Sequence, residues 1–201
     1  MPFLMLARHG ESTHNRENRF TGWLDVSLTD TGKREAKAIA AKIAGYRIDT
    51  AYSSALRRTI ESLNLVLEQL HLQKIPVVHS RELNERHYGD LQGLNKTETA
   101  EQFGDELVHT WRRSYTTAPP NGESLQDAGI RILAFFHARI LRDIQGGLNV
   151  LVVAHGNTIR AILKNLDDLT DVEIMDVTIA TGDVIVYEYD RSAAIVAKTI
   201  L

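Results

Sequence analysis

Short apolar runs alternate along the chain with longer stretches whose apolar residues recur at helical spacing. Residues 3–7 and 149–154 are nearly all apolar, which is typical of strands buried on both faces of a sheet. Shorter strands are predicted at 49–53, 76–79, 184–189 and 194–200. The alternation indicates an α/β fold, a three-layer αβα sandwich whose mostly parallel central sheet has helices on both faces.

Four stretches carry a clear helical pattern. The first begins after Thr29 or Asp30, either of which can cap it. The second places on one face Ile60, Leu63, Leu67 and Leu70. The third runs over about 124–144 and is closed by glycine, and the fourth covers 157–167. These helices and the strands before them form strand–helix units of the kind that build parallel sheets.

Residues 82–122 are more polar and show no strand pattern. Helical pieces are predicted near 96–103 and 105–116, followed by the turn Pro119-Pro120-Asn121-Gly122. Irregular segments of this length are often functional lids. We therefore expect one domain over 1–201, with a lid-like polar segment around 85–122.

Composition removes several classes of function. The chain has 201 residues, 43% hydrophobic and 24% charged, with a formal net charge of -3 and no long basic tract. This argues against nucleic acid as a partner. The absence of cysteine excludes disulfides and thiolate catalysis and fits a cytoplasmic protein. No apolar run approaches the ~20 residues needed to cross a bilayer, so we expect no membrane association.

Two histidine–glycine pairs follow the two most apolar strands. Arg8-His9-Gly10-Glu11 comes after the first, and His155-Gly156-Asn157 after the second. The carboxyl ends of parallel strands meet at one edge of the sheet, where ligands of such folds bind. Either histidine alone could be a structural residue, but two such elements make that reading much weaker. Arg8 beside the first pair suggests an anionic ligand.

Three other clusters could serve the same site. Arg57 and Arg58 follow a predicted strand, but helical neighbours point in different directions, so both cannot face inward. The stretch 82–89 offers carboxylates beside a cation, suited to a general acid or base, or to a charged surface turn. Trp111-Arg112-Arg113, with Lys96 upstream, could close over an anion or form a solvated helix face.

Other chemistries find little support. There is no metalloprotease, nucleotide P-loop or nucleophile-elbow motif, and no clustered metal-ligand spacing, so no metal is expected. Four further histidines are interpreted as surface or packing residues: His71, His79, His109 and His137. Many cations, two histidines and no thiol favour phosphoryl transfer through a phosphohistidine, because a neutral imidazole is a nucleophile.

The chain resembles the histidine phosphatase superfamily through Arg8-His9-Gly10 and His155-Gly156. Within it, the chain is similar to the 2,3-bisphosphoglycerate-dependent phosphoglycerate mutases over nearly its whole length. The more specific matches are RHGESTHN at 8–15, NRFTGWLDVSLTDTG at 18–32, YSSALRRTIES at 52–62, LNERHYGDLQGLNK at 83–96, WRR at 111–113 and HGNTIRA at 155–161.

The resemblance implies a role for each matched residue. His9 would be the phosphohistidine nucleophile, Glu85 the proton donor and acceptor, and His155 the group that stabilises the transferring phosphoryl, with Arg8 and Arg58 also catalytic. The family pattern thus selects Arg58 over its neighbour. The substrate-binding residues would be Arg8, His9, Gly10, Glu11, Ser12, Thr13, His14, Asn15, Thr21, Gly22, Arg58, Glu85, Arg86, His87, Tyr88, Lys96, Arg112, Arg113, Gly156 and Asn157.

The resemblance also implies the reaction, the interconversion of 3- and 2-phosphoglycerate in glycolysis and gluconeogenesis, primed by 2,3-bisphosphoglycerate without a metal. The partners expected are these small phosphoglycerates, with a homo-oligomer (dimer or tetramer) or a monomer as the assembly. Alternatives are a phosphatase of the same superfamily, and a non-catalytic protein that binds phosphorylated ligands. Keeping His9, Glu85 and His155 together argues against simple binding, which needs neither a nucleophile nor an acid.

Three features depart from the family pattern. Longer members carry an insertion where only Asn121-Gly122 joins the proline pair to Glu123 here, and they carry a longer mobile tail after the last strand. His14 replaces an aromatic residue, a change that we expect to be tolerated. The first two features bear on how the lid closes and on the oligomeric state.

Overall fold

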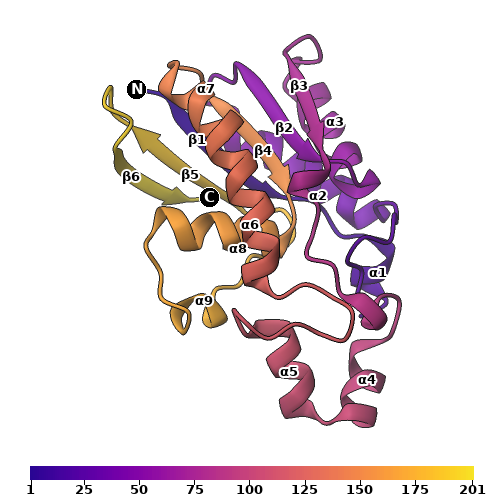
Figure 1. Ribbon diagram of the computed structural model, residues 1–201. Coiled ribbons are helices and arrows are strands. Elements are labelled where there is room, and N and C mark those ends of the chain that lie inside the picture. The colour runs from indigo at the N-terminus through magenta and orange to yellow at the C-terminus, as the bar shows by residue number, and fades with distance from the viewer.

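A six-stranded sheet with the strand order β3-β2-β4-β1-β5-β6 forms the centre of the computed structural model, which describes residues 1–201 (Figure 1). The strands β3, β2, β4 and β1 are parallel, whereas β5 is antiparallel to β1 and β6 is antiparallel to β5. Their bounds are β1 Phe3–Arg8, β2 Thr50–Ser54, β3 Val77–Ser80, β4 Val150–Ala154, β5 Val184–Tyr189 and β6 Ile195–Ile200. The predicted strands are confirmed to within one residue at each end.

Helices cover both faces of this sheet. In chain order they are α1 Thr13–Arg16, α2 Asp30–Ile43, α3 Arg57–Gln69, α4 Lys96–Phe103, α5 Asp105–Arg113, α6 Leu125–Phe135, α7 Leu141–Gln145, α8 Gly156–Leu166 and α9 Glu173–Asp176. Short 3₁₀ turns lie at Arg81–Leu83 and Gly89–Leu91. None of the helices has both the length and the apolar composition that crossing a bilayer requires.

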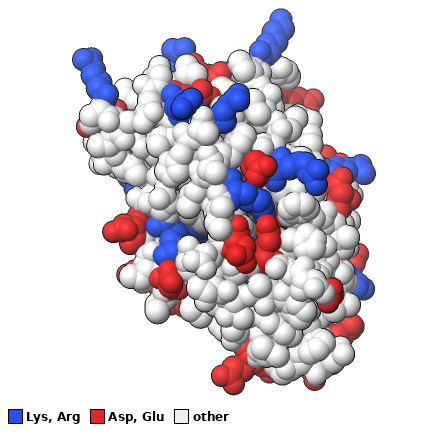
Figure 2. Space-filling model, viewed as in Figure 1, with Lys and Arg blue, Asp and Glu red and all other residues white.

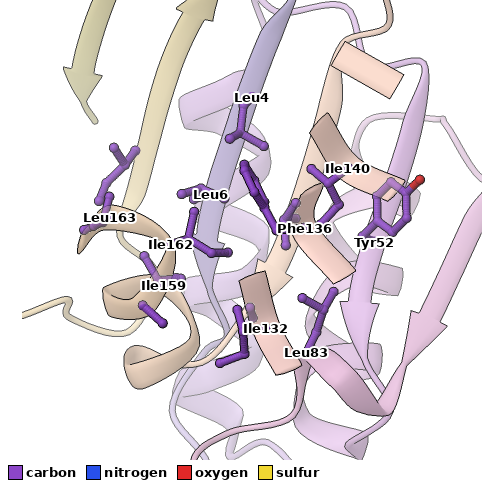
Figure 3. Packing of buried hydrophobic residues seen from close by; sticks show 14 of the residues in the cluster. Leu4, Leu6, Tyr52, Leu83, Ile132, Phe136, Ile140, Ile159, Ile162 and Leu163 are labelled. Carbon is purple, nitrogen blue, oxygen red and sulfur yellow. The ribbon is translucent and has the colours of Figure 1, made fainter. Parts of the chain in front are cut away.

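The alternation of side chains along β1 divides the core in two. Leu4 and Leu6 lie in one cluster with buried residues of α6, α7 and α8 (Figure 3). Met5 and Ala7 point to the other face and pack with buried residues of α2 and α3. Because successive strand residues face opposite sides, one continuously apolar strand fills two cores. The predicted three-layer αβα sandwich is confirmed.

The predicted helix over 124–144 forms with one interruption. It begins at a capping box in which the Ser124 hydroxyl accepts from the backbone N–H of Asp127. Phe136–Ile140 then forms a π turn between α6 and α7. Buried residues recur every fourth position (Ile132, Phe136, Ile140, Ile144). At 3.6 residues per turn this spacing drifts by about 40° per step, and one wider turn offsets part of the drift.

Helix α3 buries a slightly different face from the predicted one. Leu63 and Leu67 are buried as expected, with Val66 beside them. Ile60 belongs to no core cluster and is only partly buried, so the buried face does not extend to it as predicted. It lies at the edge of the apolar face.

The polar segment forms α4 and α5, which lie beyond the three layers (Figure 1). A small separate cluster of Phe20, Leu91, Val108 and Trp111 holds α5 against the loop after α1. On the face shown in Figure 2, Lys and Arg side chains are mixed with Asp and Glu. This face therefore carries no extended basic area.

Candidate active site

A cavity of about 160 Å³ opens at the carboxyl ends of β1 and β4. Its lining combines residues from these strand ends, from α3, and from the polar segment that includes α4 and α5. Glu85 is the one carboxylate in the lining, beside seven cations: Arg8, Arg19, Arg58, Lys96, Arg112, Arg113 and Arg160. This surplus of positive charge suits a ligand with several negative charges.

His9 is oriented by the backbone around it. Its N–H donates to the carbonyl of Ala154 over 3.0 Å, which ties the end of β1 to the end of β4. Its Nδ1 lies 2.7 Å from the carbonyl oxygen of Gly10. A carbonyl can only accept, so Nδ1 carries the proton and Nε2 keeps a free lone pair. This is the tautomer that a nucleophilic histidine needs.

His155 lies directly against His9, with ring centroids 5.0 Å apart in an edge-to-face arrangement. Its Nε2 is 2.8 Å from the hydroxyl of Ser54 at the end of β2. Its Nδ1 is buried and has no hydrogen-bond partner in the protein. A buried polar atom without a partner is costly, so this unpaired Nδ1 needs an explanation.

Both histidines are neutral near pH 7. The pKa of His9 lies well below 6.5 because burial disfavours the imidazolium and because Arg58 and Arg8 repel a further positive charge. The pKa of His155 is lowered well below 6.5 by burial, Arg58, His9 and Arg8. Neutral imidazoles are the nucleophilic and hydrogen-bonding forms.

These shifts predict that the protein loses stability in mild acid. An unfolded chain protonates its histidines near pH 6.5, whereas folded His9 and His155 stay neutral to lower pH. The free energy of unfolding should therefore fall by about 1.4 kcal/mol per pH unit for each histidine below that pH. Urea unfolding at about pH 7 and about pH 5.5 measures it. The double variant His9→Gln/His155→Gln should show a shallower dependence, and an unchanged slope would contradict the assignment.

Arg58 faces the cavity and Arg57 does not. The Arg58 side chain is buried and donates to the carbonyls of Gly22 at 2.8 Å and Leu24 at 3.1 Å. Burial lowers its pKa to about 10, so it stays charged at pH 7. Arg57 is exposed and pairs with Glu61 at 2.6 Å. The helix geometry thus resolves the choice between these neighbours.

Glu85 reaches the cavity from the loop between η1 and η2 (Arg81–Leu83 and Gly89–Leu91). Its Oε1 accepts from the backbone N–H of Arg86 over 2.8 Å. In the same loop Tyr88 lines the cavity, and its hydroxyl accepts from Asn157 Nδ2 at 3.1 Å. The loop thus brings a carboxylate and a phenol into the lining of the cavity.

Comparison with known proteins identifies this arrangement. The sequence profile of the histidine phosphatase superfamily (branch 1) matches residues 4–199. The chain is 44% identical to a 2,3-bisphosphoglycerate-dependent phosphoglycerate mutase of Lachnoclostridium phytofermentans, over 98% of this chain and 90% of the relative. It is 46% identical to a protein of the same name from Methylobacterium radiotolerans, over 98% and 94% of the two chains. The chain belongs to the 2,3-bisphosphoglycerate-dependent phosphoglycerate mutase family of the histidine phosphatase superfamily.

Solved structures agree on the fold. A mycobacterial glucosyl-3-phosphoglycerate phosphatase has a TM-score of 0.84 and 24% identity over 100% of this chain and 97% of its own. The alignments with the two mutases also bear on the short length of this chain. The first spans 225 positions, more than the 201 residues of this chain, whereas the second spans 200. A relative that carries the mutase name is therefore nearly as compact as this chain.

Thirteen of the residues predicted from the mutase family to bind substrate line the cavity: Arg8, His9, Asn15, Thr21, Gly22, Arg58, Glu85, Tyr88, Lys96, Arg112, Arg113, Gly156 and Asn157. Segments more than 100 residues apart in sequence are thus brought together. His155 lies behind His9 rather than in the lining.

Seven others do not line it: Gly10, Glu11, Ser12, Thr13, His14, Arg86 and His87. Their contacts support neighbours instead. A Cβ on Gly10 would meet the carbonyl of Gly32, and Ser12 caps α1. The guanidinium of Arg86 lies 4.6 Å from the Tyr88 ring centre and donates to the Arg112 carbonyl at 3.2 Å.

Sequence reasoning missed six lining residues: Arg19, Phe20, Arg160, Val177, Thr178 and Ile179. Arg160 could have been predicted, because it follows Gly156 by four positions and so lies on the same face of the helix. It donates to Asn157 Oδ1 at 2.8 Å and to the carbonyl of Ile174 at 2.6 Å. The loop 177–179 carries no periodic or motif signal. No group of three His, Cys, Asp or Glu side chains in the structure could hold a metal ion.

Proposed function

We propose that this chain interconverts 3-phosphoglycerate and 2-phosphoglycerate through a phosphohistidine at His9. The observation that carries the proposal is the pairing of two buried, neutral histidines with a cavity lined by seven cations and one carboxylate. A bisphosphorylated acid presents two phosphates and a carboxylate, and the cations match these anions. The names of the two mutase relatives agree with this substrate.

The first step transfers a phosphoryl group from phosphorylated His9 to 3-phosphoglycerate. The 2-hydroxyl oxygen attacks phosphorus, its proton passes to the Glu85 carboxylate, and the bond to Nε2 breaks with its electron pair returning to the imidazole. Arg8 and Arg58 from the cavity lining, together with His155 beside His9, would stabilise the charge spread over the transferring oxygens. The product is 2,3-bisphosphoglycerate.

The second step reverses these roles on the other phosphate. Nε2 of His9 attacks the 3-phosphoryl group, the oxygen–phosphorus bond breaks, and Glu85 returns its proton to the departing oxygen. The enzyme is again phosphorylated and 2-phosphoglycerate leaves. The cycle starts only with a phosphorylated His9, and 2,3-bisphosphoglycerate would supply that first phosphoryl group.

The bisphosphorylated intermediate must turn within the site without meeting water. The segment 85–122 supplies cavity residues from its loop and from α4 and α5, namely Glu85, Tyr88, Lys96, Arg112 and Arg113. We propose that this segment closes over the intermediate. Such closure excludes water and strengthens the electrostatic contacts inside.

A phosphatase of the same superfamily is the second candidate. It would use the same His9 and pass the phosphoryl group to water. Structural likeness to a phosphatase at 24% identity shows the shared fold alone. The two relatives at 44% and 46% identity carry the mutase name and favour the mutase.

One assay separates these activities. The protein is given 3-phosphoglycerate with and without catalytic 2,3-bisphosphoglycerate, product is coupled to enolase, and free phosphate is followed in parallel. The mutase predicts 2-phosphoglycerate formation that 2,3-bisphosphoglycerate stimulates, with little phosphate. Phosphate release without 2-phosphoglycerate would contradict it, and tight binding without turnover would favour a binding protein.

The remaining proposals concern context. Work in glycolysis and gluconeogenesis would place the protein in the cytoplasm with small phosphoglycerates as its only required partners. A dimer or tetramer is compatible with this function, and so is a monomer. Sedimentation of the purified protein distinguishes these assemblies.

A further inference from the structure

The proposed acid–base residue lies on a loop with little regular structure. Glu85 follows the single 3₁₀ turn Arg81–Leu83 and precedes another at Gly89–Leu91. No strand or α-helix includes it. Proton transfer requires the carboxyl oxygen within hydrogen-bond reach of the reacting oxygen. Some contact outside the loop must therefore fix the position of Glu85.

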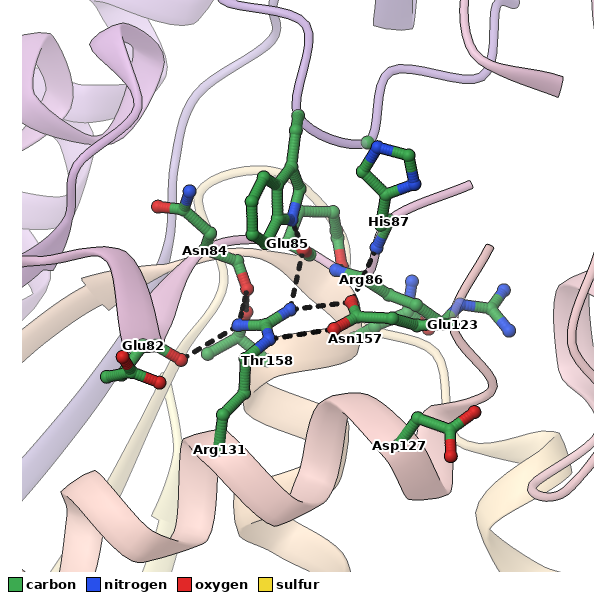
Figure 4. Close-up of polar contacts among 12 residues, drawn as sticks. Glu82, Asn84, Glu85, Arg86, His87, Glu123, Asp127, Arg131, Asn157 and Thr158 are labelled. Carbon is green, nitrogen blue, oxygen red and sulfur yellow. Dashed lines mark hydrogen bonds and ion pairs between the residues drawn. The ribbon is translucent and has the colours of Figure 1, made fainter. Parts of the chain in front are cut away.

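Arg131 of α6 makes that contact (Figure 4). Its guanidinium donates to the carbonyl of Glu82 in the preceding 3₁₀ turn at 2.9 Å, and to the loop carbonyls of Asn84 at 2.8 Å and Glu85 at 3.0 Å. The Glu85 carbonyl also accepts from Trp23 Nε1 at 2.6 Å. The backbone of the acid–base residue is thus held from two sides.

Glu123 completes the arrangement. Its two carboxylate oxygens accept from Arg131 at 3.0 Å and 2.8 Å. The Glu123 carboxylate accepts from the N–H of His87 at 2.8 Å, and its own N–H donates to the His87 carbonyl at 2.8 Å. One side chain of α6 and one residue just before it therefore hold the loop on both sides of Glu85.

These contacts do not touch the cavity. Neither Arg131 nor Glu123 is among its lining residues. Arg131 is largely buried, with 16% of its side chain exposed. Its five hydrogen bonds as donor all go to Glu123 or to backbone carbonyls between Glu82 and Glu85. A bidentate arginine–carboxylate pair has a fixed geometry, which suits positioning rather than binding.

We propose that Arg131, held by Glu123, is a positioning residue that sets the location of the Glu85 carboxyl for proton transfer. The inference rests on the proposed function. A displacement of about 1 Å at a reacting group can cost about 100-fold in rate. Loss of Arg131 therefore slows those steps in which Glu85 moves a proton, and spares a step that needs no proton.

Leaving-group chemistry isolates that difference. When His9 takes a phosphoryl group from 2,3-bisphosphoglycerate, the departing alkoxide needs the proton of Glu85. When it takes one from p-nitrophenyl phosphate, the oxygen–phosphorus bond breaks to give p-nitrophenolate, which is stable without a proton. The rate of single-turnover phosphorylation of His9 therefore depends on the acid when 2,3-bisphosphoglycerate is the donor. It does not depend on the acid when p-nitrophenyl phosphate is the donor.

The test compares Arg131→Met with wild type for both donors. We expect phosphorylation by 2,3-bisphosphoglycerate to slow by about 10- to 100-fold, and the p-nitrophenolate burst to change by less than about 3-fold. Arg131→Lys keeps the charge but not the bidentate geometry and should show the same selectivity with a smaller loss. Glu123→Gln should resemble Arg131→Lys, because the partner of Arg131 then loses its negative charge but keeps its shape.

Arg139→Met, at an exposed arginine of the π turn, is the matched control and should behave as wild type. An equal loss with both donors would show that Arg131 only maintains the fold, and wild-type rates with both would remove any role; either result overturns the proposal. If Arg131→Met does not fold, the lysine and Glu123→Gln variants decide on the same criteria. A wild-type protein that accepts no phosphoryl group from 2,3-bisphosphoglycerate would instead refute the proposed function.

Discussion

Replacing His9 with glutamine should abolish both turnover and the acid-labile phosphoenzyme. Loss of a nucleophile removes the covalent route entirely, and comparable losses in other enzymes are on the order of 10⁴-fold or more. Glutamine has no nucleophilic lone pair to replace Nε2, although it can keep a contact with the Gly10 carbonyl. Acid quenching after incubation with labelled 2,3-bisphosphoglycerate measures the phosphoenzyme, and the enolase-coupled assay measures turnover.

His137→Gln is the matched control, because His137 is exposed on the π turn Phe136–Ile140 and does not line the cavity. It should form the phosphoenzyme as wild type does. An acid-labile phosphoenzyme that survives in His9→Gln but disappears in another histidine variant would assign the nucleophile elsewhere. Thermal unfolding of both variants checks that the fold is intact.

Replacing Glu85 with glutamine should lower kcat by about 10²- to 10⁴-fold, the range found when a general acid or base is removed. The amide keeps the size of the side chain and can still contact the Arg86 N–H. It cannot take the proton of the 2-hydroxyl or return it. KM should change much less, because the cations that bind the anions remain.

The control is Glu82→Gln, an exposed carboxylate in the 3₁₀ turn just before the loop, whose side chain lies outside the cavity. It should leave kcat within about 2-fold of wild type, as surface substitutions usually do. A Glu85→Gln protein with wild-type kcat would show that another group moves the proton. Tyr88, whose phenol also lines the cavity from this loop, would then be the next candidate.

The sequence predicted the layers of the fold because periodicity is a local property. The apolar runs of β1 and β4 have no polar position to face solvent, so they had to lie inside the sheet. The start of α2 followed from two residues that can cap a helix, Thr29 and Asp30, and in the structure Thr29 is the cap, its side chain accepting from the Gly32 N–H. The π turn within the long helix could not be predicted, because it depends on how Phe136 and Ile140 meet the sheet.

The site could be predicted where a chemically reactive residue directly follows a predicted strand. His9 and His155 follow buried strands, and parallel strands bring their ends together. Spacing alone left Arg57 and Arg58 open, the family pattern selected Arg58, and Arg58 is the one that lines the cavity. The loop 177–179 and the Arg131 contacts depend on tertiary packing between segments that show no local signal, so only the structure reveals them.

The most direct test of the central claim follows one phosphoryl group. Enzyme carrying ³²P on His9 is isolated and mixed with unlabelled 3-phosphoglycerate in a single turnover. The label should appear in 2,3-bisphosphoglycerate and 2-phosphoglycerate, because the 2-hydroxyl takes it from the histidine. Label found in inorganic phosphate at the same rate with or without 3-phosphoglycerate would contradict the account and identify a phosphatase.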